Sequence, residues 1–565
     1  MSLLGSLQIA NNSLFAQQVG LQVVANNISN ANTHGYIQQR AVFTPSPTQV
    51  ISGLTLGMGV EVEAIIQNVD RFLQDRLRAA NSDLANSETQ ERAYLELEVM
   101  VGELSETDLS TSLSNFFGSI HDIVNQPGDF SVRRLAVLEG VTLSDDIRRL
   151  DARVGDLRTN LNREVVSVAD DINRLTRLIA ELNVEITIVE SDQTSSSEAV
   201  GLRDQRGIAL EELAGIVGIR SVEQPTGAVN VFAGSDFLVL AGDRRLVEPS
   251  NSIVDGSTIA TVNIAATDSP MAASTGKLAG LYAARDEIFG GFQTELQELT
   301  EALIFEFNKV FSSGQGLTGF ESVTGTSAVN DTTAALDDAG LAFAPENGSF
   351  QIEVKNTVTD VTETVDVFID LNGLPTDTSL DDLTSTLNAI SGISAQITLD
   401  NRLQIASDSK LTEFSFSKDT SGALAALGIN TFFTGSTTSN IGVNQVVNDD
   451  TTKFVASRDG VGVDADQAVA LADFLNTPLE SYGQRSLSTI YEDFVGEVVQ
   501  SAAVSRSVKD GFLTFARTLE GQHLGVTGVS VDEEAVKMIA YQRAFQASAR
   551  MIATLDELLG TLVNL

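Results

Sequence analysis

Apolar residues recur at seven-residue intervals at both ends of the chain, and this periodicity constrains the fold more than any other feature. The N-terminal seam comprises Leu3, Leu7, Leu14, Leu21, Val24 and Ile28. The C-terminal seam comprises Val531, Met538, Tyr541, Phe545, Ile552, Leu555, Leu559 and Leu562. Heptads are typical of helices that pack against helices, so we expect the two termini to form a coiled coil. For the first segment alone, an ordinary amphipathic helix is the alternative.

The N-terminal segment is almost free of charge. Arg40 is the only formally charged residue among the first 60. Asn, Gln and Ser occupy the faces of the expected helix beside the seam, which suggests that neutral protein surface covers them. At the other end, the acidic run Asp532–Glu534 suits the N-terminus of a helix, where the helix dipole favours negative charge.

Longer helical patterns lie between the termini. One runs from Ile147 to Ile186 with charged residues on its outer faces, and another starts at Ile66 and continues to Leu84. Residues 278–311 and 484–520 carry further helical patterns. The chain has only nine prolines, which permits long unbroken helices. Four long helices predict an elongated bundle.

Two stretches change to the two-residue period of β-strands. Residues 221–265 are rich in Val, Thr and Gly and predict a small β region. In residues 321–460, alternation at 350–354 and 365–369 predicts two strands, and a turn at Asp400-Asn401 separates two more. Between these pairs, Ser379 and Asp382 form a capping-box pattern that begins a helix. The predicted order is ββαββ.

These elements predict a mainly α chain with β insertions, in the α+β class and elongated. The four expected parts are a terminal coiled-coil polymerisation domain (1–40 plus 526–565), a helical rod domain (41–220 plus 266–320 plus 461–525), a small β region (221–265) and a β-rich outer insert (321–460). In this nested order, the terminal helices enclose the rod helices, which enclose the β segments. Both chain termini should therefore meet at one end.

Composition and motifs argue against an enzyme. A net charge of −41 would repel nucleic acid and anionic lipid, so we expect neither nucleic-acid binding nor membrane insertion. Cysteine is absent and histidine occurs three times, which leaves few side chains for a metal or acid–base site. The glycines of 314–319 lack a strand–loop–helix context, and Asp464 and Asp466 resemble helix caps. We expect no catalytic, cofactor-binding or metal-binding residues, and we interpret His34 as a loop residue.

Both ends of the chain resemble bacterial flagellar axial proteins, the family of rod, hook and hook-associated subunits. The N-terminal signature is ANNISNANTHGY at 25–36, with Asn26, Asn27, Asn30, Gly35 and Tyr36 as its marked residues. The C-terminal match comprises GVSVDEE at 528–534 and YQRAFQASAR at 541–550. The interior segment LRDQR at 202–206 is similar to one in the hook-associated members. The resemblance covers about 1–320 and 455–565 and leaves the insert largely outside.

The resemblance implies a structural adaptor at the junction between hook and filament. It implies a ring of identical copies in the flagellar axis that contacts hook protein and other hook-associated proteins. It also implies a secreted, extracellular subunit that leaves the cell through the flagellar type III apparatus without a cleaved signal. A dedicated export chaperone would bind the C-terminal helix, about residues 525–565. The alternatives are a hook or distal-rod subunit, or an appendage protein whose insert is a binding or adhesion module.

Overall fold

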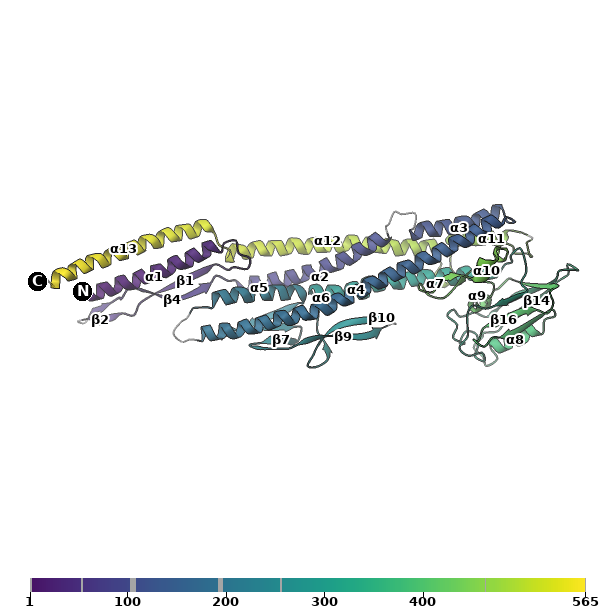
Figure 1. Cartoon of the computed structure of the whole chain (residues 1–565), viewed down its shortest axis with the longest axis horizontal. Helices are drawn as coiled ribbons and strands as arrows, with labels where there is room; N and C mark the ends of the chain where they lie inside the picture. Colours follow the sequence, from purple (N-terminus) through teal and green to yellow (C-terminus); the bar gives the residue numbers. More distant parts are fainter. Residues whose placement is uncertain are drawn as a thin grey trace. The chain divides into compact units, whose positions relative to one another are not determined.

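Helices and short sheets alternate along the chain, in a mixed α+β fold that is mainly helical (Figure 1). The computed structural model describes residues 3–51, 54–101, 108–191, 197–254, 257–462 and 464–563. Two compact units divide the chain: unit 1 comprises 1–93, 159–285 and 503–565, and unit 2 comprises 94–158 and 286–502. Four helices contribute residues to both units: α2 (Arg71–Val101), α4 (Phe130–Glu190), η1 (Ala284–Phe289) and α12 (Leu487–Thr527). Within the described part, no helix is both long and apolar enough to cross a membrane.

Unit 1 holds both terminal helices. Its own helices are α1 (Leu3–Ser29), α5 (Val200–Ile216), α6 (Gly276–Ala283) and α13 (Val531–Val563). Its strands are β1 (Gln39–Pro45), β2 (Gln49–Ile51), β3 (Leu54–Leu56), β4 (Val60–Gln67), β5 (Ile219–Glu223), β6 (Val229–Ala233), β7 (Asp236–Leu240), β8 (Asp243–Arg244), β9 (Val247–Val254), β10 (Ser257–Ile264) and β11 (Ser269–Pro270). They form antiparallel sheets in the orders β1-β4, β2-β3, β5-β6-β7-β8 and β11-β10-β9. Strands β5 to β10 lie at 219–264, the stretch for which the sequence predicted a small β region at 221–265.

The strands that follow α1 were not predicted. Ile66 was expected to begin a helix, but it lies in β4 and pairs with Arg40 of β1. Helix α2 instead begins at Arg71. It begins there because the carboxylate of Asp70 caps it, accepting a hydrogen bond from the N–H of Leu73 at 3.1 Å. The apolar spacing of this short stretch fits both periods, and the capping aspartate separates them.

The core of unit 1 is built on the second half of α4. The apolar row predicted between Ile147 and Ile186 continues through this half, and its members there are at most 7% exposed: Leu161, Val168, Ile172, Leu175, Ile179, Leu182 and Ile186. Such a row gives a helix one continuous apolar face, and burial of that face is its main source of stability.

Unit 2 combines helices with the β-rich insert. Its helices are α3 (Leu109–Asn125), α7 (Gly290–Ser312), α8 (Leu380–Asn388), α9 (Ala423–Leu427), α10 (Gln445–Asp449), η2 (Thr451–Lys453), α11 (Asp466–Asp473), η3 (Phe474–Asn476) and η4 (Glu480–Tyr482). Its strands are β12 (Ser322–Thr324), β13 (Gly348–Asn356), β14 (Thr362–Ile369), β15 (Ile393–Ile397), β16 (Leu403–Ser407), β17 (Thr412–Ser417), β18 (Phe433–Thr434) and β19 (Gly442–Val443). The largest buried side chains of its helical part form one aromatic cluster: Phe116, Phe117, Phe307, Phe311, Phe432, Phe433, Phe454 and Phe474.

Within residues 321–460, the elements β13, β14, α8, β15 and β16 follow one another in the order ββαββ, and strands β12, β17, β18 and β19 and short helices accompany them. Strand β17 pairs with β13. The sheets have the orders β14-β13-β17 and β12-β16-β15. At the start of α8, Ser379 accepts from the N–H of Asp382, whose carboxylate accepts from the N–H of Ser379. The capping box is confirmed, and it fixes where α8 begins.

Candidate assembly interface

Helices α1 and α13 of unit 1 lie side by side and antiparallel (Figure 1). They contact each other at seven-residue intervals along both helices. Three pairs define this contact: Ser13 with Ser548, Gly20 with Tyr541, and Asn27 with Glu534. The α1 residues of these three pairs are small or polar, and none of them belongs to the predicted leucine seam.

The small side chains bring the two helices close together. The hydroxyls of Ser13 and Ser548 lie 2.9 Å apart. A Cβ atom on Gly20 would lie only 3.0 Å from the ring of Tyr541, so a larger residue would force the ring or the helices to shift. On its other side, the Tyr541 ring packs edge-on against Phe43 of β1, with 6.1 Å between ring centroids.

The N-terminal seam remains partly open to solvent. Its residues lie about a quarter of a turn around α1 from the row that contacts α13. Val24 is 2% exposed, whereas the other five members are half-buried: Leu3, Leu7, Leu14, Leu21 and Ile28. Apolar surface left in water can still be buried by another protein, which would stabilise the complex by ~25 cal/mol per Å².

The members of the predicted C-terminal seam differ in their exposure to solvent. Leu555 is 7% exposed, and Val531 at the start of α13 is 50% exposed. The side chain of Leu562 lies outside the described residues. The remaining members are half-buried along α13: Met538, Tyr541, Phe545, Ile552 and Leu559.

A buried carboxylate joins α13 to the N-terminal segment. Glu534 is fully buried, and its Oε2 accepts a hydrogen bond from Nδ2 of Asn27 at 3.0 Å. Its Oε1 accepts from Nε2 of Gln38 at 3.0 Å and from Nζ of Lys537 at 2.7 Å. A buried carboxylate is stable only when it is paired and hydrogen-bonded, and these three donors meet that need.

Asn27 is the centre of this polar cluster. Its side chain is 1% exposed, and Nδ2 donates both to Glu534 and to the carbonyl of Gln39 at 2.9 Å. Its Oδ1 accepts from the N–H of Gln39 at 3.0 Å and from the hydroxyl of Tyr36 at 2.8 Å. All four hydrogen-bonding positions of the amide are therefore used. We call Asn27, Tyr36, Gln38, Gln39 and Glu534 the terminal lock.

The rest of the signature forms the turn that reverses the chain after α1. Asn26 donates to Oε1 of Gln39 at 3.2 Å, and Asn30 donates back to the carbonyl of Asn26 at 3.0 Å. Gly35 has φ +74°, and a Cβ there would lie 2.4 Å from Cγ1 of Ile208 on α5. Backbone conformation and space both require glycine at this position. His34 lies in this turn, as expected.

Asp204 of α5 holds the other side of the turn. Its carboxylate accepts a hydrogen bond from the N–H of Ile37 and one from Nε2 of Gln67, at 2.6 Å. Burial raises the pKa of Asp204 to about 7, although both hydrogen bonds act to lower it. Burial, followed by the charges of Asp204 and Glu534, raises the pKa of Tyr36, which keeps its phenol protonated as the donor to Asn27.

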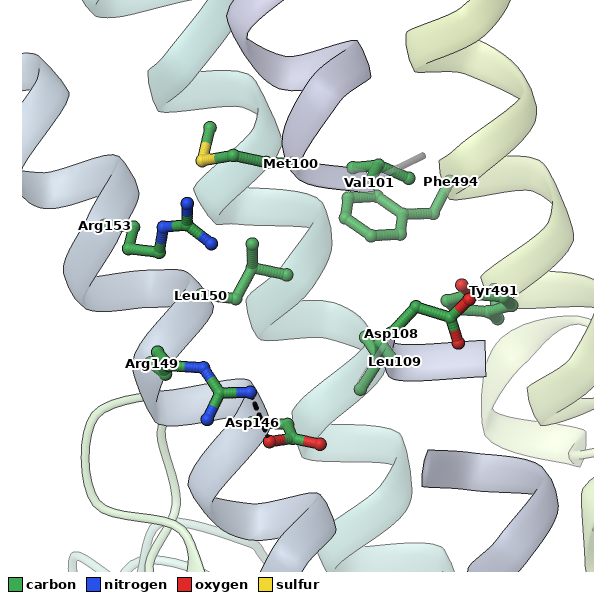
Figure 2. A pocket seen from close by; sticks show the side chains of 10 residues that line it. All are labelled: Met100, Val101, Asp108, Leu109, Asp146, Arg149, Leu150, Arg153, Tyr491 and Phe494. Atoms are coloured by element: carbon green, nitrogen blue, oxygen red, sulfur yellow. Dashed lines mark hydrogen bonds and ion pairs between the residues drawn. The ribbon is translucent and has the colours of Figure 1, made fainter. Parts of the chain in front are cut away.

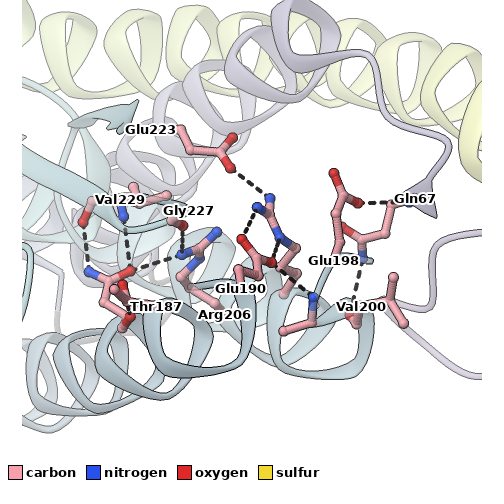
Figure 3. Close-up of polar contacts among 12 residues, drawn as sticks. Gln67, Thr187, Glu190, Glu198, Val200, Arg206, Glu223, Gly227 and Val229 are labelled. Atoms are coloured by element: carbon pink, nitrogen blue, oxygen red, sulfur yellow. Dashed lines mark hydrogen bonds and ion pairs between the residues drawn. The ribbon is translucent and has the colours of Figure 1, made fainter. Parts of the chain in front are cut away.

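The LRDQR segment anchors α5 to its neighbours (Figure 3). Nε of Arg203 lies 2.7 Å from Oε1 of Glu190 on α4, and Nη1 lies 2.6 Å from Oε1 of Glu223 on β5. Arg206 is 4% exposed and donates to the carbonyl of Gly227 at 2.7 Å and to Asn183 at 2.9 Å. These charged side chains connect α5 to α4, to β5 and to the loop before β6.

A cavity of 260 Å³ lies within unit 2, between helices α2, α3, α4 and α12 (Figure 2). Its buried carboxylate, Asp146, is already bonded to Arg149 at 2.6 Å and to the hydroxyl of Ser112. Its lining residues are Met100, Val101, Asp108, Leu109, Asp146, Arg149, Leu150, Arg153, Tyr491 and Phe494. The described residues contain no cluster of His, Asp or Glu side chains that could hold a metal ion.

The glycines at 314–319 and Asp464, which in the sequence were compared with binding motifs, have structural roles. The glycines at 314, 316 and 319 lie in the loop after α7, and a Cβ on Gly316 would lie 2.3 Å from the carbonyl of Thr452. Asp464 accepts from the N–H groups of Arg458, Asp459 and Asp466, each at 2.9 Å. It therefore organises the loop before α11 in the manner of a cap.

Three family models match the chain. The helical domain of flagellar hook-associated protein FlgK matches residues 94–326. The C-terminal region of flagellar basal body rod FlgEFG protein matches 520–565, and flagella basal body rod protein matches 7–36. The two shorter matches coincide with the helices that form the terminal contact.

Curated relatives match over nearly their full length. Flagellar hook-associated protein 1 of Escherichia coli strain K12 is 23% identical over 577 residues, which cover 98% of each chain. The protein of that name from Salmonella typhimurium is 24% identical, over 98% of this chain and 99% of its own. That from Bacillus subtilis strain 168 is 22% identical, over 99% and 97%. The chain belongs to the flagellar hook-associated protein family.

The fold of this hook-associated protein matches a solved structure of the same family. The flagellar hook junction protein FlgK from Burkholderia pseudomallei superposes with a TM-score of 0.50 at 15% identity, covering 80% of this chain and 100% of that chain. In this hook-associated protein, the signature residues have physical roles. Asn27 and Tyr36 form the terminal lock, Asn26 and Asn30 shape the turn, and Gly35 permits it.

Two lock residues, Gln38 and Gln39, were not singled out in the sequence, and neither was Gly20 in the contact between α1 and α13. Glu534 was noted in the acidic run and in the C-terminal match, but without a role in the lock. A glutamate followed three residues later by Lys537 was a visible signal of an ion pair on α13. Nothing in the sequence showed that this glutamate would be buried against α1.

Proposed function

We propose that this chain is the structural adaptor at the junction between the flagellar hook and filament. The observation that carries the proposal is the half-buried leucine seam on α1, in a unit whose two terminal helices are already held together by the terminal lock. A chain of the hook-associated family with an incompletely covered apolar seam at its terminal helices is suited to bind neighbouring subunits. Its full-length match to proteins named hook-associated protein 1 supports the same position.

Assembly follows from burial of the open seam. Burying a leucine or isoleucine side chain contributes ~1.5–3 kcal/mol, so a few seam residues outweigh the cost of ordering the partners. Identical copies arranged as a ring around the flagellar axis would each complete the burial of the next. Residues 1–40 with 526–565 are then the polymerisation domain, and residues 321–460 form the outer module.

Partners and export follow from the same position in the flagellum. Hook protein would lie on one side of the ring and the other hook-associated proteins on the other. The subunit would leave the cell through the flagellar type III apparatus without a cleaved signal, with a chaperone on residues 525–565. A chain without cysteine can pass unfolded without forming disulfides.

A deletion strain tests the proposal. Electron microscopy should show hooks of normal number that carry no attached filaments, with filament protein released into the medium. A plasmid copy of the gene should restore attachment. Loss of the hook itself would indicate a hook or distal-rod subunit, and normal flagella would refute an assembly role.

A further inference from the structure

Two phenylalanines and an arginine form an exposed cluster on unit 1, on helices α2 and α12 and outside the terminal helix pair. The Phe72 side chain is 71% exposed and the Phe515 side chain 45%. The guanidinium carbon of Arg76 lies 5.7 Å from the ring centroid of Phe72 and 5.9 Å from that of Phe515. Arginine at this distance is attracted to the face of an aromatic ring. We call these three residues the Phe–Arg cluster.

The packing of α2 against α12 does not depend on the Phe–Arg cluster. Beneath it, α2 and α12 already share a buried apolar core that contains Leu73, Leu77, Ala516 and Leu519. On the outer side, Val504 and Val508 are 55% and 45% exposed, and they lie on the same row of α12 as Phe515. Exposed apolar side chains that share one face of a helix, as Val504, Val508 and Phe515 do on α12, favour contact with another protein.

The charge of the cluster restricts its partner. No carboxylate in the described part of the chain pairs with Arg76. Aromatic residues and arginine dominate the binding energy of protein interfaces, particularly where they are shielded together. The chain as a whole carries −41, so copies of it repel one another unless a cation of one faces carboxylates of the next.

We propose that the Phe–Arg cluster binds an acidic helix face on a second copy of this chain in the assembled flagellum. This inference rests on the proposed function, because it requires copies to lie next to one another in the flagellar axis. The rings supply apolar area, and Arg76 supplies the charge that makes contact between two acidic copies favourable. It adds a contact on α2 and α12 to the one proposed for the terminal helices.

Photo-cross-linking in cells tests the contact. A benzophenone amino acid replaces Phe72, and flagella are isolated after illumination. The expected product has twice the 60.1 kDa mass of the chain and contains only this protein. The same replacement of Phe368 on β14, which is 73% exposed, should give no such product. Absence of the product from the Phe72 variant, or cross-linking to a different flagellar protein alone, overturns the inference.

Charge reversal supplies the matched test. Arg76→Glu in the cross-linking variant should reduce the product by about tenfold or more, because like charges across an interface cost several kcal/mol. Arg517→Glu, an exposed arginine about half a turn around α12 from Phe515, should leave it unchanged. Equal yields from Arg76→Glu and Arg517→Glu, at unchanged helix content, overturn the proposed role of Arg76. If the unmodified protein is not recovered with flagella at all, the proposed function fails as well.

Discussion

At the scale of single residues, the terminal lock explains why an asparagine-rich signature lies at the end of an apolar helix. The buried amide of Asn27 uses all of its hydrogen-bonding positions, and the buried carboxylate of Glu534 accepts from three side chains. Buried polar groups contribute little net stability when satisfied, but an unpaired one is costly. The lock therefore specifies one arrangement of α1, β1 and α13.

Substitution of Asn27 tests the lock. Asn27→Ala leaves Glu534 and the Gln39 backbone short of partners, at a cost of about 1–3 kcal/mol. That cost should speed amide hydrogen exchange in α1 and α13 by about 5- to 150-fold, measured by mass spectrometry. Asn32→Ala removes an exposed asparagine from the same turn and should change exchange in α13 little. Equal effects of the two substitutions would contradict the lock.

Asp204 predicts a pH dependence of stability. Its pKa of about 7 in the folded chain lies above its ordinary value, so the folded state holds a proton that the unfolded state releases. The stability from this group is present at low pH and is lost as the pH rises through about 7. Asp204→Asn resembles the protonated form and keeps the oxygen that accepts from Gln67.

The measurement is the urea midpoint of wild type and Asp204→Asn as the pH is varied. The advantage of the variant should grow between about pH 4 and pH 7 and then level off, because only the wild type has the Asp204 carboxyl that must release its proton in the folded state. The comparison cancels the other acidic groups, which the two proteins share. An advantage that is constant or that shrinks with rising pH would show that this carboxyl is not buried as described.

At the scale of helices and strands, the heptads predicted the two terminal helices but not the faces through which they meet. The leucine row of α1 was the predicted contact seam because it is apolar, whereas α13 contacts Ser13, Gly20 and Asn27. Close approach of two helices favours small residues, which leave no strong signal in a hydrophobicity pattern. The hairpin of β1 and β4 was missed for a related reason, since its apolar residues also fit a helical period.

Gly20 tests the close contact between the terminal helices. Gly20→Val would force the ring of Tyr541 aside, with an expected cost of about 1–3 kcal/mol for overpacking. Thermal unfolding followed by circular dichroism should show a lower midpoint for the helical transition. Gly521→Val on α12, where an added Cβ meets no atom within 4 Å, is the control and should change it much less. Removal of the ring by Tyr541→Ala should reduce the effect of Gly20→Val.

At the scale of the whole molecule, the sequence predicted the class of fold, the order of the insert and the family. Periodicity was sufficient where a helix or strand has one apolar face, as in α4 and β13. Contacts between residues far apart in the chain, such as Asn27 with Glu534, depend on tertiary packing and could not be predicted from local pattern. Charge is distributed unevenly along the chain. The first 60 residues, with Arg40 as their only charged side chain, contain the helix whose seam stays open in a single copy.

The open seam leads to the most direct test of the assembly account. A triple variant, Leu7→Gln, Leu14→Gln and Leu21→Gln, is expressed in the deletion strain, and attached filaments are counted by electron microscopy. The three leucines are half-buried and lie about a quarter of a turn from the row of Ser13, Gly20 and Asn27, so the purified variant should keep its helix content. The matched variant Leu7→Met, Leu14→Met and Leu21→Met preserves apolar surface and should attach filaments normally. We predict intact hooks without filaments for the glutamine variant, whereas wild-type numbers of attached filaments would contradict assembly through this seam.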